Sequence, residues 1–478
     1  MTARPYDLVV VGGGSAGLTA AGLGAALGAR VALLDRERLG GECLWTGCVP
    51  SKALIAAAGA AQQARELAAL GLSGRLDPVD LGQVMDRVQA VIHTIAQGEN
   101  AETLRARGID VHFGDVRFTS PHILAVTGQE LRGRAFLLCT GSSPAVPAID
   151  GLAESGYLTN ETIFGLRRLP EHLIVVGGGP IGVELAQAFR RLGSAVTIVS
   201  GERGLLPRED DEVRRAVADL FHREGIAVHR GRLAQVARTG DDAQVTCSIT
   251  GSDAVLRGDT LLLAVGRRPN VAGLGLEQAG VQYDVRRGIN VDTYLRTSTP
   301  HIFACGDVTG PYQFTHAAGF QAATAVRNAL FPWAKGKSRL DPMPWTTFTD
   351  PEVARVGLTE AEARHTHGHV LVLRSSFAHN DRAQTEGRAE GFVKLIVTPW
   401  RGRILGAHIV GPQAGELLQE VTLAMRTGQN VRALSDTLHV YPTLSLAVQQ
   451  AALGFYKQWP LARLAGAPLR ALAHRARE

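Results

Sequence analysis

The sequence predicts an α/β fold in which one strand–turn–helix–strand unit occurs twice. An apolar strand-like run ends in a Gly-x-Gly-x-x-Gly turn at residues 12–17, and the same arrangement recurs at residues 177–182. Each unit also closes alike, with an apolar run, a glycine and a proline, in FLLCTGSSP (136–144) and LLLAVGRRP (261–269). An internal duplication of this kind predicts two Rossmann-like dinucleotide-binding domains.

The first unit, YDLVVVGGGSAGLTAAGLGAALGARVALLD, contains the parts that dinucleotide binding requires. Gly12, Gly14 and Gly17 allow a tight turn, the close approach of a pyrophosphate, and packing of the helix on the strand. The N-terminus of that helix presents N–H groups and positive potential to the phosphates. The second strand, 31–34, ends in Asp35, whose carboxylate can accept hydrogen bonds from a ribose.

The second unit, HLIVVGGGPIGVELAQAFRRLGSAVTIVS, repeats the pattern with Gly177, Gly179 and Gly182. An enzyme with two such sites commonly holds a flavin in one and a nicotinamide in the other, because hydride transfer needs the two rings stacked together. Gly141 and Gly266, in the closing turns of the two units, are further candidates for cofactor contact. The alternative is a duplication in which one site no longer binds.

The composition indicates a globular protein of several domains. The 478 residues are 45% apolar and 20% charged, and the formal charge is only +5. Because basic residues are dispersed, we expect no nucleic-acid partner. No apolar run approaches the ~20 residues of a membrane-spanning helix, and the first strand begins too early for a signal peptide. We therefore expect a cytoplasmic protein without an integral membrane segment.

The stretch GGECLWTGCVPSK, residues 40–52, places Cys43 close to Cys48 in a chain with only five cysteines. One helical turn can hold this spacing in disulfide geometry. The helix formers after Cys48 predict a helix start, whose positive potential would stabilise a Cys48 thiolate suited to electron exchange. Zinc would need more ligands than the pair supplies, and a purely structural disulfide would be unusual in a reducing cytoplasm. We predict a redox-active pair and no metal site.

Together with TSTPHIFACGDVTG (297–310), these motifs resemble the pyridine nucleotide–disulfide oxidoreductases, the flavoprotein family of dihydrolipoamide dehydrogenase, glutathione reductase and mercuric reductase. The resemblance implies an FAD-binding domain split into residues 1–150 and 271–343, an NAD(P)-binding domain at 151–270, and an α+β dimerisation domain at 344–460. It also implies a homodimer with active sites shared across the subunits. Residues 461–478 form a basic, helix-like tail in this division of the chain.

The resemblance implies roles for individual residues as well. The first glycine motif would bind FAD, with Asp307 of the CGD segment at the ribityl chain and Gly306 beside it, and the second motif would bind the nicotinamide cofactor. Cys48 would face the flavin and Cys43 would exchange with substrate. Lys52 and Glu184 would pair near the flavin's reducible nitrogen.

The end of the second unit bears on the choice of nicotinamide. An NAD site usually has an acid there, whereas this chain offers Ser200, followed by Glu202 and Arg203. Ser200 cannot repel a 2′-phosphate and Arg203 can meet one. We therefore expect NADPH, with NADH as the alternative if Glu202 turns into the site.

The chain departs from the family near its C-terminus, in LHVYPTLSLAVQQAA. Thiol-active members carry a His-Pro segment followed by Ser-Glu, which the partner subunit contributes. Here Tyr441 occupies the His position and Leu446 the Glu position. Tyrosine, with an ordinary pKa of about 10, is a poor proton shuttle near neutral pH. His439, two residues earlier, is an imperfect substitute.

These features predict an FAD-dependent NAD(P)H oxidoreductase that passes electrons through Cys43 and Cys48 to a small non-thiol acceptor, with mercuric ion, quinones and dyes as candidates. Lys52, Glu184 and Tyr441 complete the set of candidate catalytic residues. One alternative is a dithiol–disulfide oxidoreductase such as dihydrolipoamide dehydrogenase, with His439 or water as its base. Another is a nucleotide-binding protein with incidental diaphorase activity.

Overall fold

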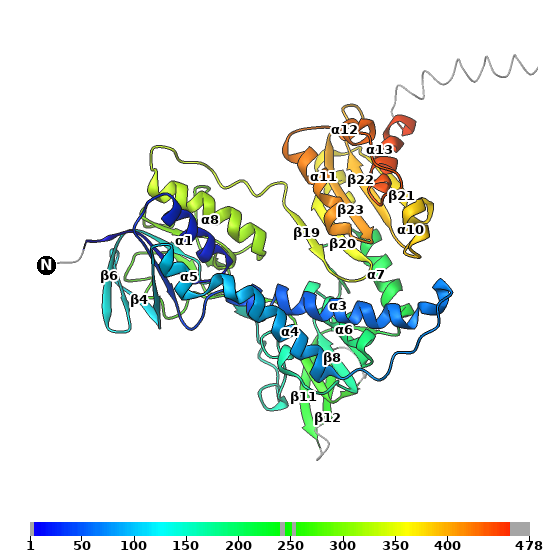
Figure 1. Cartoon of the computed structure of the whole chain (residues 1–478), viewed down its shortest axis with the longest axis horizontal. Coiled ribbons are helices and arrows are strands. Elements are labelled where there is room, and N and C mark those ends of the chain that lie inside the picture. The colour runs from blue at the N-terminus through cyan, green and yellow to red at the C-terminus, as the bar shows by residue number, and fades with distance from the viewer. Residues whose placement is uncertain (1–3, 240–243, 251–254, 459–478) are drawn as a thin grey trace, which may run out of the picture.

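The computed structural model describes residues 4–239, 244–250 and 255–458, so the predicted tail at 461–478 lies outside the described residues. Its first sheet carries the first glycine turn (Figure 1). The parallel strands follow the order β3-β2-β1-β6, and β18 pairs with β6. They are β1 (Tyr6–Val11), β2 (Val31–Asp35), β3 (Ile109–Phe113), β6 (Gln129–Leu138) and β18 (Ile302–Ala304). The antiparallel strands β4 (Val116–Ser120) and β5 (Ile123–Val126) extend this sheet.

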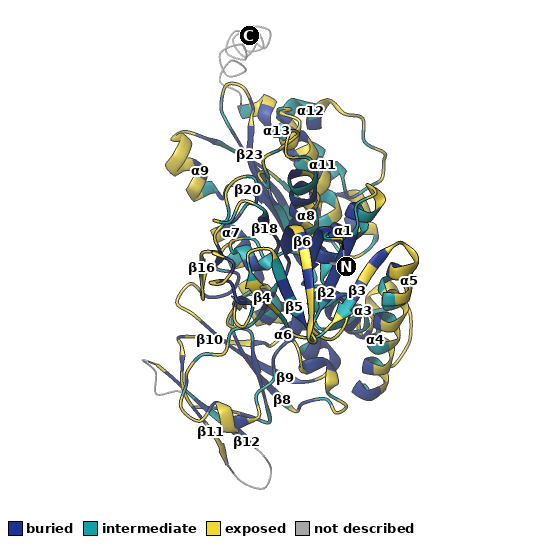
Figure 2. Cartoon of the chain, turned by 90° about the vertical axis from the view of Figure 1, so that its left-hand side faces the viewer, coloured by how far each residue is buried: buried dark blue, intermediate teal, exposed yellow. Residues whose placement is uncertain are grey.

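Two helices lie side by side on one face of this sheet, α1 (Ser15–Ala26) and α8 (Thr315–Leu330) (Figure 1). Alanines on both helices are fully buried, so the helices can approach the sheet and each other closely. The strands at the centre of the sheet are dark blue in Figure 2, which marks them as buried. Because β18 and α8 follow the second unit in the chain, the chain leaves this sheet and returns to it. The domain boundaries given above stay predictions.

The second unit has a sheet of the same kind, with four parallel strands in the order β10-β9-β8-β14. These strands are β8 (His172–Val176), β9 (Ala195–Ser200), β10 (Ala227–Arg230) and β14 (Thr260–Leu263). Helix α6 (Pro180–Leu192) follows the second glycine turn, and α7 (Asp211–Arg223) precedes β10. An antiparallel sheet projects from this unit, formed by β11 (Leu233–Thr239), β12 (Gln244–Ile249) and β13 (Val255–Gly258).

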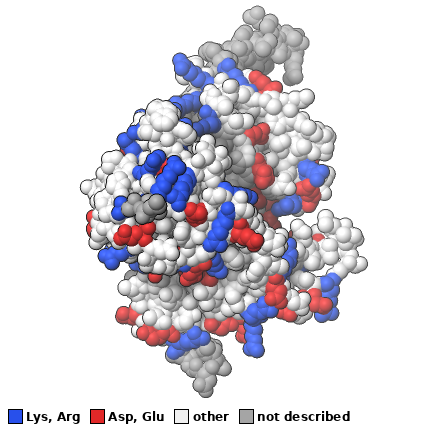
Figure 3. Space-filling model, turned by 60° about the vertical axis from the view of Figure 1, so that its left-hand side comes forward, with Lys and Arg blue, Asp and Glu red and all other residues white. Residues whose placement is uncertain are grey.

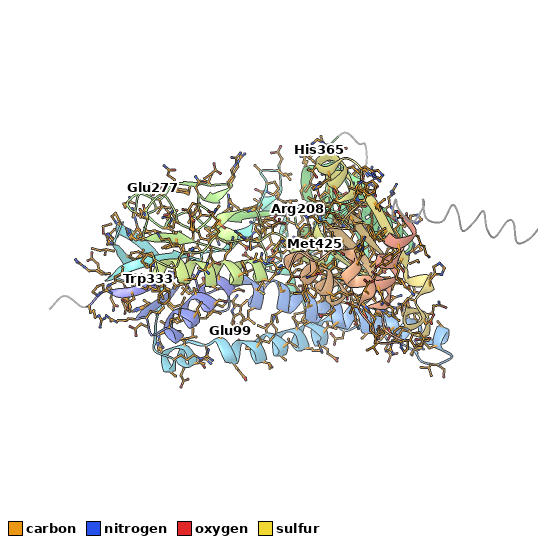
Figure 4. All side chains as sticks on the ribbon, turned by 90° about the horizontal axis from the view of Figure 1, so that it is seen from above. Glu99, Arg208, Glu277, Trp333, His365 and Met425 are labelled. Carbon is orange, nitrogen blue, oxygen red and sulfur yellow. The ribbon has the colours of Figure 1, made fainter. Side chains whose placement is uncertain are left out.

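The C-terminal part is an antiparallel sheet of five strands with helices packed on it. The strand order is β19-β20-β23-β22-β21, with bounds Pro344–Thr347, Glu352–Gly357, Ile404–Gly411, Phe392–Val397 and Leu371–Ser376. Helices α11 (Ala414–Arg426), α12 (Val431–Asp436) and α13 (Leu446–Gln458) share its apolar core. Figure 4 shows Glu277 and Trp333 on the left, in the part of the molecule formed by the first sheet, and His365 and Met425 to the right of them, in the C-terminal part.

The two cysteines begin a helical segment that joins the parts. Helix α2 (Gly41–Trp45) holds Cys43, and α3 (Cys48–Arg65) packs against α6 of the second unit and against α4 (Leu81–Ala96). The segment Gly41–Arg65 has a mean hydropathy of 1.2 and is long enough to cross a membrane, as the core helix of a globular protein can also be. Blue and red side chains alternate over the face shown in Figure 3, without one large basic area.

Candidate active site

One continuous cavity of about 2480 Å³ runs between the two glycine turns and the C-terminal sheet. Most of the predicted site residues line it. They are Gly12, Gly14, Asp35, Cys43, Cys48, Lys52, Gly141, Gly177, Gly179, Glu184, Arg203, Gly266, Gly306 and Asp307. Segments far apart in the sequence therefore share one site.

The two glycine turns have the same geometry, for the same steric reasons. Gly12 and Gly177 have φ of +103° and +126°, in the range that glycine alone adopts easily. A Cβ on Gly17 would lie 1.7 Å from the Gly12 carbonyl oxygen, and a Cβ on Gly182 would lie 2.0 Å from that of Gly177. The third glycine of each turn thus lets the helix touch the strand.

The middle glycine of each turn instead faces open space. A Cβ on Gly14 would have its nearest neighbour at 3.7 Å, and one on Gly179 would meet nothing within 4 Å. Both glycines line the cavity at the N-terminus of a helix, α1 or α6, whose N–H groups suit a pyrophosphate. The two turns therefore fit dinucleotides.

Backbone N–H groups of the glycine turn and of the residues after Asp35 hold its carboxylate in place. Its Oδ2 accepts from the Gly13 N–H at 2.7 Å, and its Oδ1 accepts from the N–H groups of Glu37 and Arg38 at 3.1 and 3.2 Å. A carboxylate has about four acceptor positions, so a ribose hydroxyl can still donate to it. Asp35 therefore fixes the glycine turn in addition to its predicted contact with a ribose.

A buried arginine connects Asp307 to the segment that holds Cys43. Arg267, whose side chain is 12% exposed, donates to both carboxylate oxygens of Glu42. Its Nε donates to Ser142 Oγ at 2.8 Å, and that hydroxyl donates to Asp307 Oδ2 at 2.6 Å. Sequence reasoning missed Glu42 and Arg267, although both lie in stretches it quoted, because nothing local shows that they meet.

The expected partnership of Lys52 and Glu184 is present in the geometry. Lys52 Nζ lies 2.7 Å from Glu184 Oε2, and the Glu184 side chain is only 7% exposed. The Phe348 N–H donates to Glu184 Oε1 at 2.8 Å, and Lys52 Nζ lies 4.4 Å from the centre of the Phe348 ring. The pair joins α3, α6 and the segment after β19 at one wall of the cavity.

The pKa values of the two thiols of the predicted redox pair depend on each other. The interaction with the Cys48 side chain lowers the pKa of Cys43 from 9.0 to about 6. The same interaction, with burial, raises the pKa of Cys48, although Lys52 acts to lower it. This interaction favours charge on Cys43, whereas the helix start favours charge on Cys48, and the predicted contact of Cys48 with the flavin stays a prediction. Among the described residues, no three His, Cys, Asp or Glu side chains gather in a way that would hold a metal.

At the end of the cavity formed by the second unit, Ser200 and Arg203 differ in position. Ser200 ends β9, is 1% exposed and does not line the cavity, and its Oγ has no hydrogen-bond partner among the residues that the structure describes. Arg203 lines the cavity, together with Arg232 and with Arg208, which Figure 4 labels. Arg208 and Arg232 follow later in the chain than the turn after β9, so the pattern of that turn does not indicate them.

The C-terminal segment lies outside the cavity of its own chain. Tyr441 is 68% exposed, and its hydroxyl donates to Asp381 at 2.9 Å. Leu446 is the first residue of α13. His439 has both ring nitrogens engaged, Nε2 with Glu420 Oε2 at 3.0 Å and Nδ1 with the Thr437 carbonyl at 2.9 Å. Burial raises the pKa of Glu420, and the hydrogen bond with His439 acts to lower it.

Comparison with known proteins agrees with this geometry. Residues 6–322 match the family described as pyridine nucleotide-disulphide oxidoreductase, and residues 343–452 match its dimerisation domain. A mercuric reductase of Staphylococcus aureus is 33% identical over 95% of this chain and 83% of its own length. A dihydrolipoyl dehydrogenase of Thermus scotoductus is 36% identical over 95% of this chain and 98% of its own length.

Solved structures agree as well. The HOCl-induced flavoprotein disulfide reductase RclA of Escherichia coli superposes with a TM-score of 0.85 at 30% identity, over 94% of this chain and 99% of that one. LpdA of Mycobacterium tuberculosis gives a TM-score of 0.86 at 30% identity, over 94% and 99% of the two chains. With both of its family segments matched over almost its whole length, the chain belongs to the pyridine nucleotide-disulphide oxidoreductases, enzymes that bind FAD and NAD(P)H.

Proposed function

We propose that the enzyme is an NADPH-dependent FAD reductase that passes electrons through Cys43 and Cys48 to a small acceptor other than a thiol, with quinones and dyes first and mercuric ion second. The proposal accounts for two features of the chain. The residues expected to carry electrons from the nicotinamide to the thiols are present, whereas the C-terminal segment lacks the acid–base pair that thiol substrates need. The homologue named mercuric reductase and the homologue named dihydrolipoyl dehydrogenase leave both acceptor classes open. The choice therefore depends on this chain's own residues.

The observation that carries the proposal is the chemistry of residues 437–446. Tyr441 and Leu446 stand where thiol-active relatives have an acid–base pair, and His439 is bound at both nitrogens within its own chain. A proton shuttle needs a nitrogen free to reach the substrate. Because His439 has none, the dithiol alternative loses the base that the sequence suggested for it.

The residues around the cavity have separate tasks in this proposal. When bound, FAD supplies the two-electron chemistry between nicotinamide and disulfide. Gly14 and Gly179 leave room for the two pyrophosphates. The Lys52–Glu184 pair keeps a positive charge fixed at the cavity wall, and the Cys43 thiolate is the group that can meet an acceptor.

A panel of acceptors tests the proposal directly. With saturating NADPH, we expect a quinone or dye to be reduced fast, and lipoamide and glutathione disulfide to be reduced slowly. Removal of a general acid–base typically costs about 10² to 10⁴ in rate, so the disulfide rates should be lower by a factor in that range. Rapid lipoamide turnover by the unmodified enzyme would instead support a dihydrolipoamide dehydrogenase.

Restoring the acid–base pair provides the gain-of-function control. Tyr441→His with Leu446→Glu should raise disulfide turnover by about 10²-fold, provided that the partner subunit brings the segment to Cys43. Either single change should raise it less, because the imidazole needs an orienting carboxylate. The matched dimerisation domain supports a homodimer, and the shared site is part of this proposal. A cytoplasmic location also remains a prediction.

The preference for NADPH over NADH is the finer part of the proposal. Arg203, Arg208 and Arg232 line the nicotinamide end of the cavity, where a guanidinium can bind a 2′-phosphate. Rapid-reaction measurements should show faster flavin reduction by NADPH. Arg203→Ala should weaken NADPH binding about tenfold and leave NADH binding unchanged, whereas equal weakening of both cofactors would contradict the assignment.

A further inference from the structure

We infer that His316 is the proton donor of the acceptor site, and that the acceptor is a planar quinone that docks against the aromatic side chains beside it. This inference rests on the proposed function and extends it to a residue that the sequence motifs do not single out. His316 is the second residue of α8 and is exposed, and it lines the same cavity as the two thiols.

The position of His316 relative to the thiols follows from its neighbour. Thr315 Oγ1 lies 3.7 Å from Cys48 Sγ, so the first turn of α8 touches the redox pair. His316 is the next residue, and both residues line the cavity. This contact joins residues 267 positions apart, which is why no local pattern in the sequence revealed it.

One hydrogen bond determines which nitrogen of His316 is available. Nε2 lies 2.8 Å from the carbonyl oxygen of Pro344. A carbonyl only accepts, so Nε2 keeps its proton and Nδ1 is the nitrogen that binds and releases the transferable one. The same bond holds the ring in place. This arrangement differs from His439, where both nitrogens are engaged.

Aromatic side chains next to His316 favour a planar acceptor. The His316 ring stacks on Phe314 with centroids 5.5 Å apart and planes at 27°, and Phe314 stacks on Trp345 at 6.1 Å and 12°. All three line the cavity. A quinone ring can extend such a stack, and its carbonyl oxygens need protons on reduction.

The reaction balances with His316 as donor. NADPH gives up a hydride, which carries two electrons and one proton. The imidazolium of His316 gives the second proton from Nδ1, and the quinone leaves as a hydroquinone. Solvent then returns a proton to Nδ1. The overall change is NADPH plus one proton plus quinone giving NADP⁺ plus hydroquinone.

The experiment compares two acceptors in His316→Gln. Ferricyanide takes one electron and no proton, so its reduction should be unchanged. Quinone reduction should fall by about 100-fold in kcat with little change in KM, the size expected for loss of a general acid.

Two further variants separate the possible outcomes. His301 is the matched control, because its Nε2 also contacts a proline carbonyl, at 2.7 Å, and it does not line the cavity; His301→Gln should change neither acceptor. The other titratable groups around His316 are the thiols, Lys52, Glu184, Glu352 and Glu416, which line the cavity, and Glu209, which accepts from Trp345 Nε1. Loss of quinone reduction in Glu352→Gln rather than in His316→Gln would overturn the inference.

The outcomes also distinguish this inference from the proposed function. Fast quinone reduction that is unchanged in His316→Gln would disprove the role of His316 and leave the proposed function standing. Slow quinone reduction with fast, His316-dependent lipoamide turnover would overturn the proposed acceptor and keep His316 as a proton-transfer group for thiols.

Discussion

At the scale of single residues, the two thiols show how a direct contact outweighs a helix terminus. Cys48 begins α3, whose positive potential favours a thiolate there. The interaction with the Cys48 side chain lowers the pKa of Cys43 and raises that of Cys48, so it favours charge on Cys43 instead. The local sequence predicts the potential of the helix start, but only the folded segment 43–48 brings the two side chains together.

This assignment predicts the pH dependence of alkylation. In the reduced enzyme, iodoacetamide should modify Cys43 first, at a rate that rises with pH around a midpoint of about 6, because its pKa is lowered to that value. Cys48→Ala removes this interaction, so the midpoint should move up toward 9.0, the ordinary value. Mass spectrometry identifies the modified cysteine.

The control for alkylation is Cys247→Ser, which removes a buried cysteine outside the cavity and should leave the profile unchanged. Initial modification at Cys48 would show that the thiolate lies on the second sulfur, as the helix start alone suggests.

At the scale of elements, different glycines of the second glycine turn serve helix packing and cofactor binding. The turn joins β8 to α6, and its three glycines have different surroundings although they lie within six residues. Gly182 contacts the strand and Gly179 faces the cavity. The same difference holds for Gly17 and Gly14 in the first turn.

We predict that Gly179→Ala weakens NADPH binding by at least tenfold while the melting temperature falls by only about 2–4 °C, since alanine at a helix N-cap costs about 1 kcal/mol more than glycine. The added methyl meets no protein atom within 4 Å and occupies space that the pyrophosphate needs. Fluorescence titration with NADPH and thermal unfolding measure the two effects.

The matched variant is Gly182→Ala, whose methyl would lie 2.0 Å from the Gly177 oxygen. It should lower the melting temperature strongly, because helix and strand must separate. Equal thermal losses in both variants would show that Gly179 has a structural role after all.

At the scale of the whole molecule, a buried cluster of charged residues joins the second unit to the C-terminal sheet. Lys394 on β22 is 3% exposed and lies 2.7 Å from Asp210, 3.0 Å from Glu212 and 2.9 Å from Glu360. Asp210 also caps α7, so the cluster fixes the helix that follows the arginine-lined end of the cavity. His408 lies in β23, fully buried near this cluster.

This cluster predicts acid sensitivity in two steps. Burial lowers the pKa of His408 from 6.5 to about 4. Because the pKa of His408 is lower in the folded state, the unfolded state takes up the proton first as the pH falls. The contribution of neutral His408 to the free energy of unfolding is therefore complete above pH 6.5 and is lost as the pH falls through 4, by about 3 kcal/mol in total. Burial acts to raise the pKa of Asp210, but the bonds from Lys394 and the Glu360 N–H lower it to about 2, so its contribution is lost between 3.8 and 2.

Urea unfolding at a series of pH values measures the first step. His408→Gln keeps a donor for the Leu358 carbonyl and should abolish the loss between pH 6.5 and 4, whatever its stability at pH 7. His379→Gln changes an exposed histidine and should keep the loss. An unchanged slope in His408→Gln would place the titrating group elsewhere.

The sequence by itself determined the features that depend on a few neighbouring residues. Gly12, Gly17, Gly177 and Gly182 could be recognised because a positive φ or a close approach within one turn tolerates only glycine. The spacing of Cys43 and Cys48 likewise follows from one helical segment. The family was therefore predictable from the sequence, while the two dinucleotide sites and the redox pair stay predictions that these residues carry.

Tertiary structure alone decided the contacts between distant segments. Arg267 with Glu42, His439 with Glu420, and Thr315 with Cys48 are pairs that no local periodicity brings together. These contacts depend on the positions of α8, α11 and the closing turn of the second unit, and the sheets on which these segments pack set those positions. The arrangement of the sheets in turn depends on the burial of many side chains from all parts of the chain. For that reason the sequence predicted the electron-donating side of this enzyme, and the fold was needed to find the residue beside it that can supply a proton.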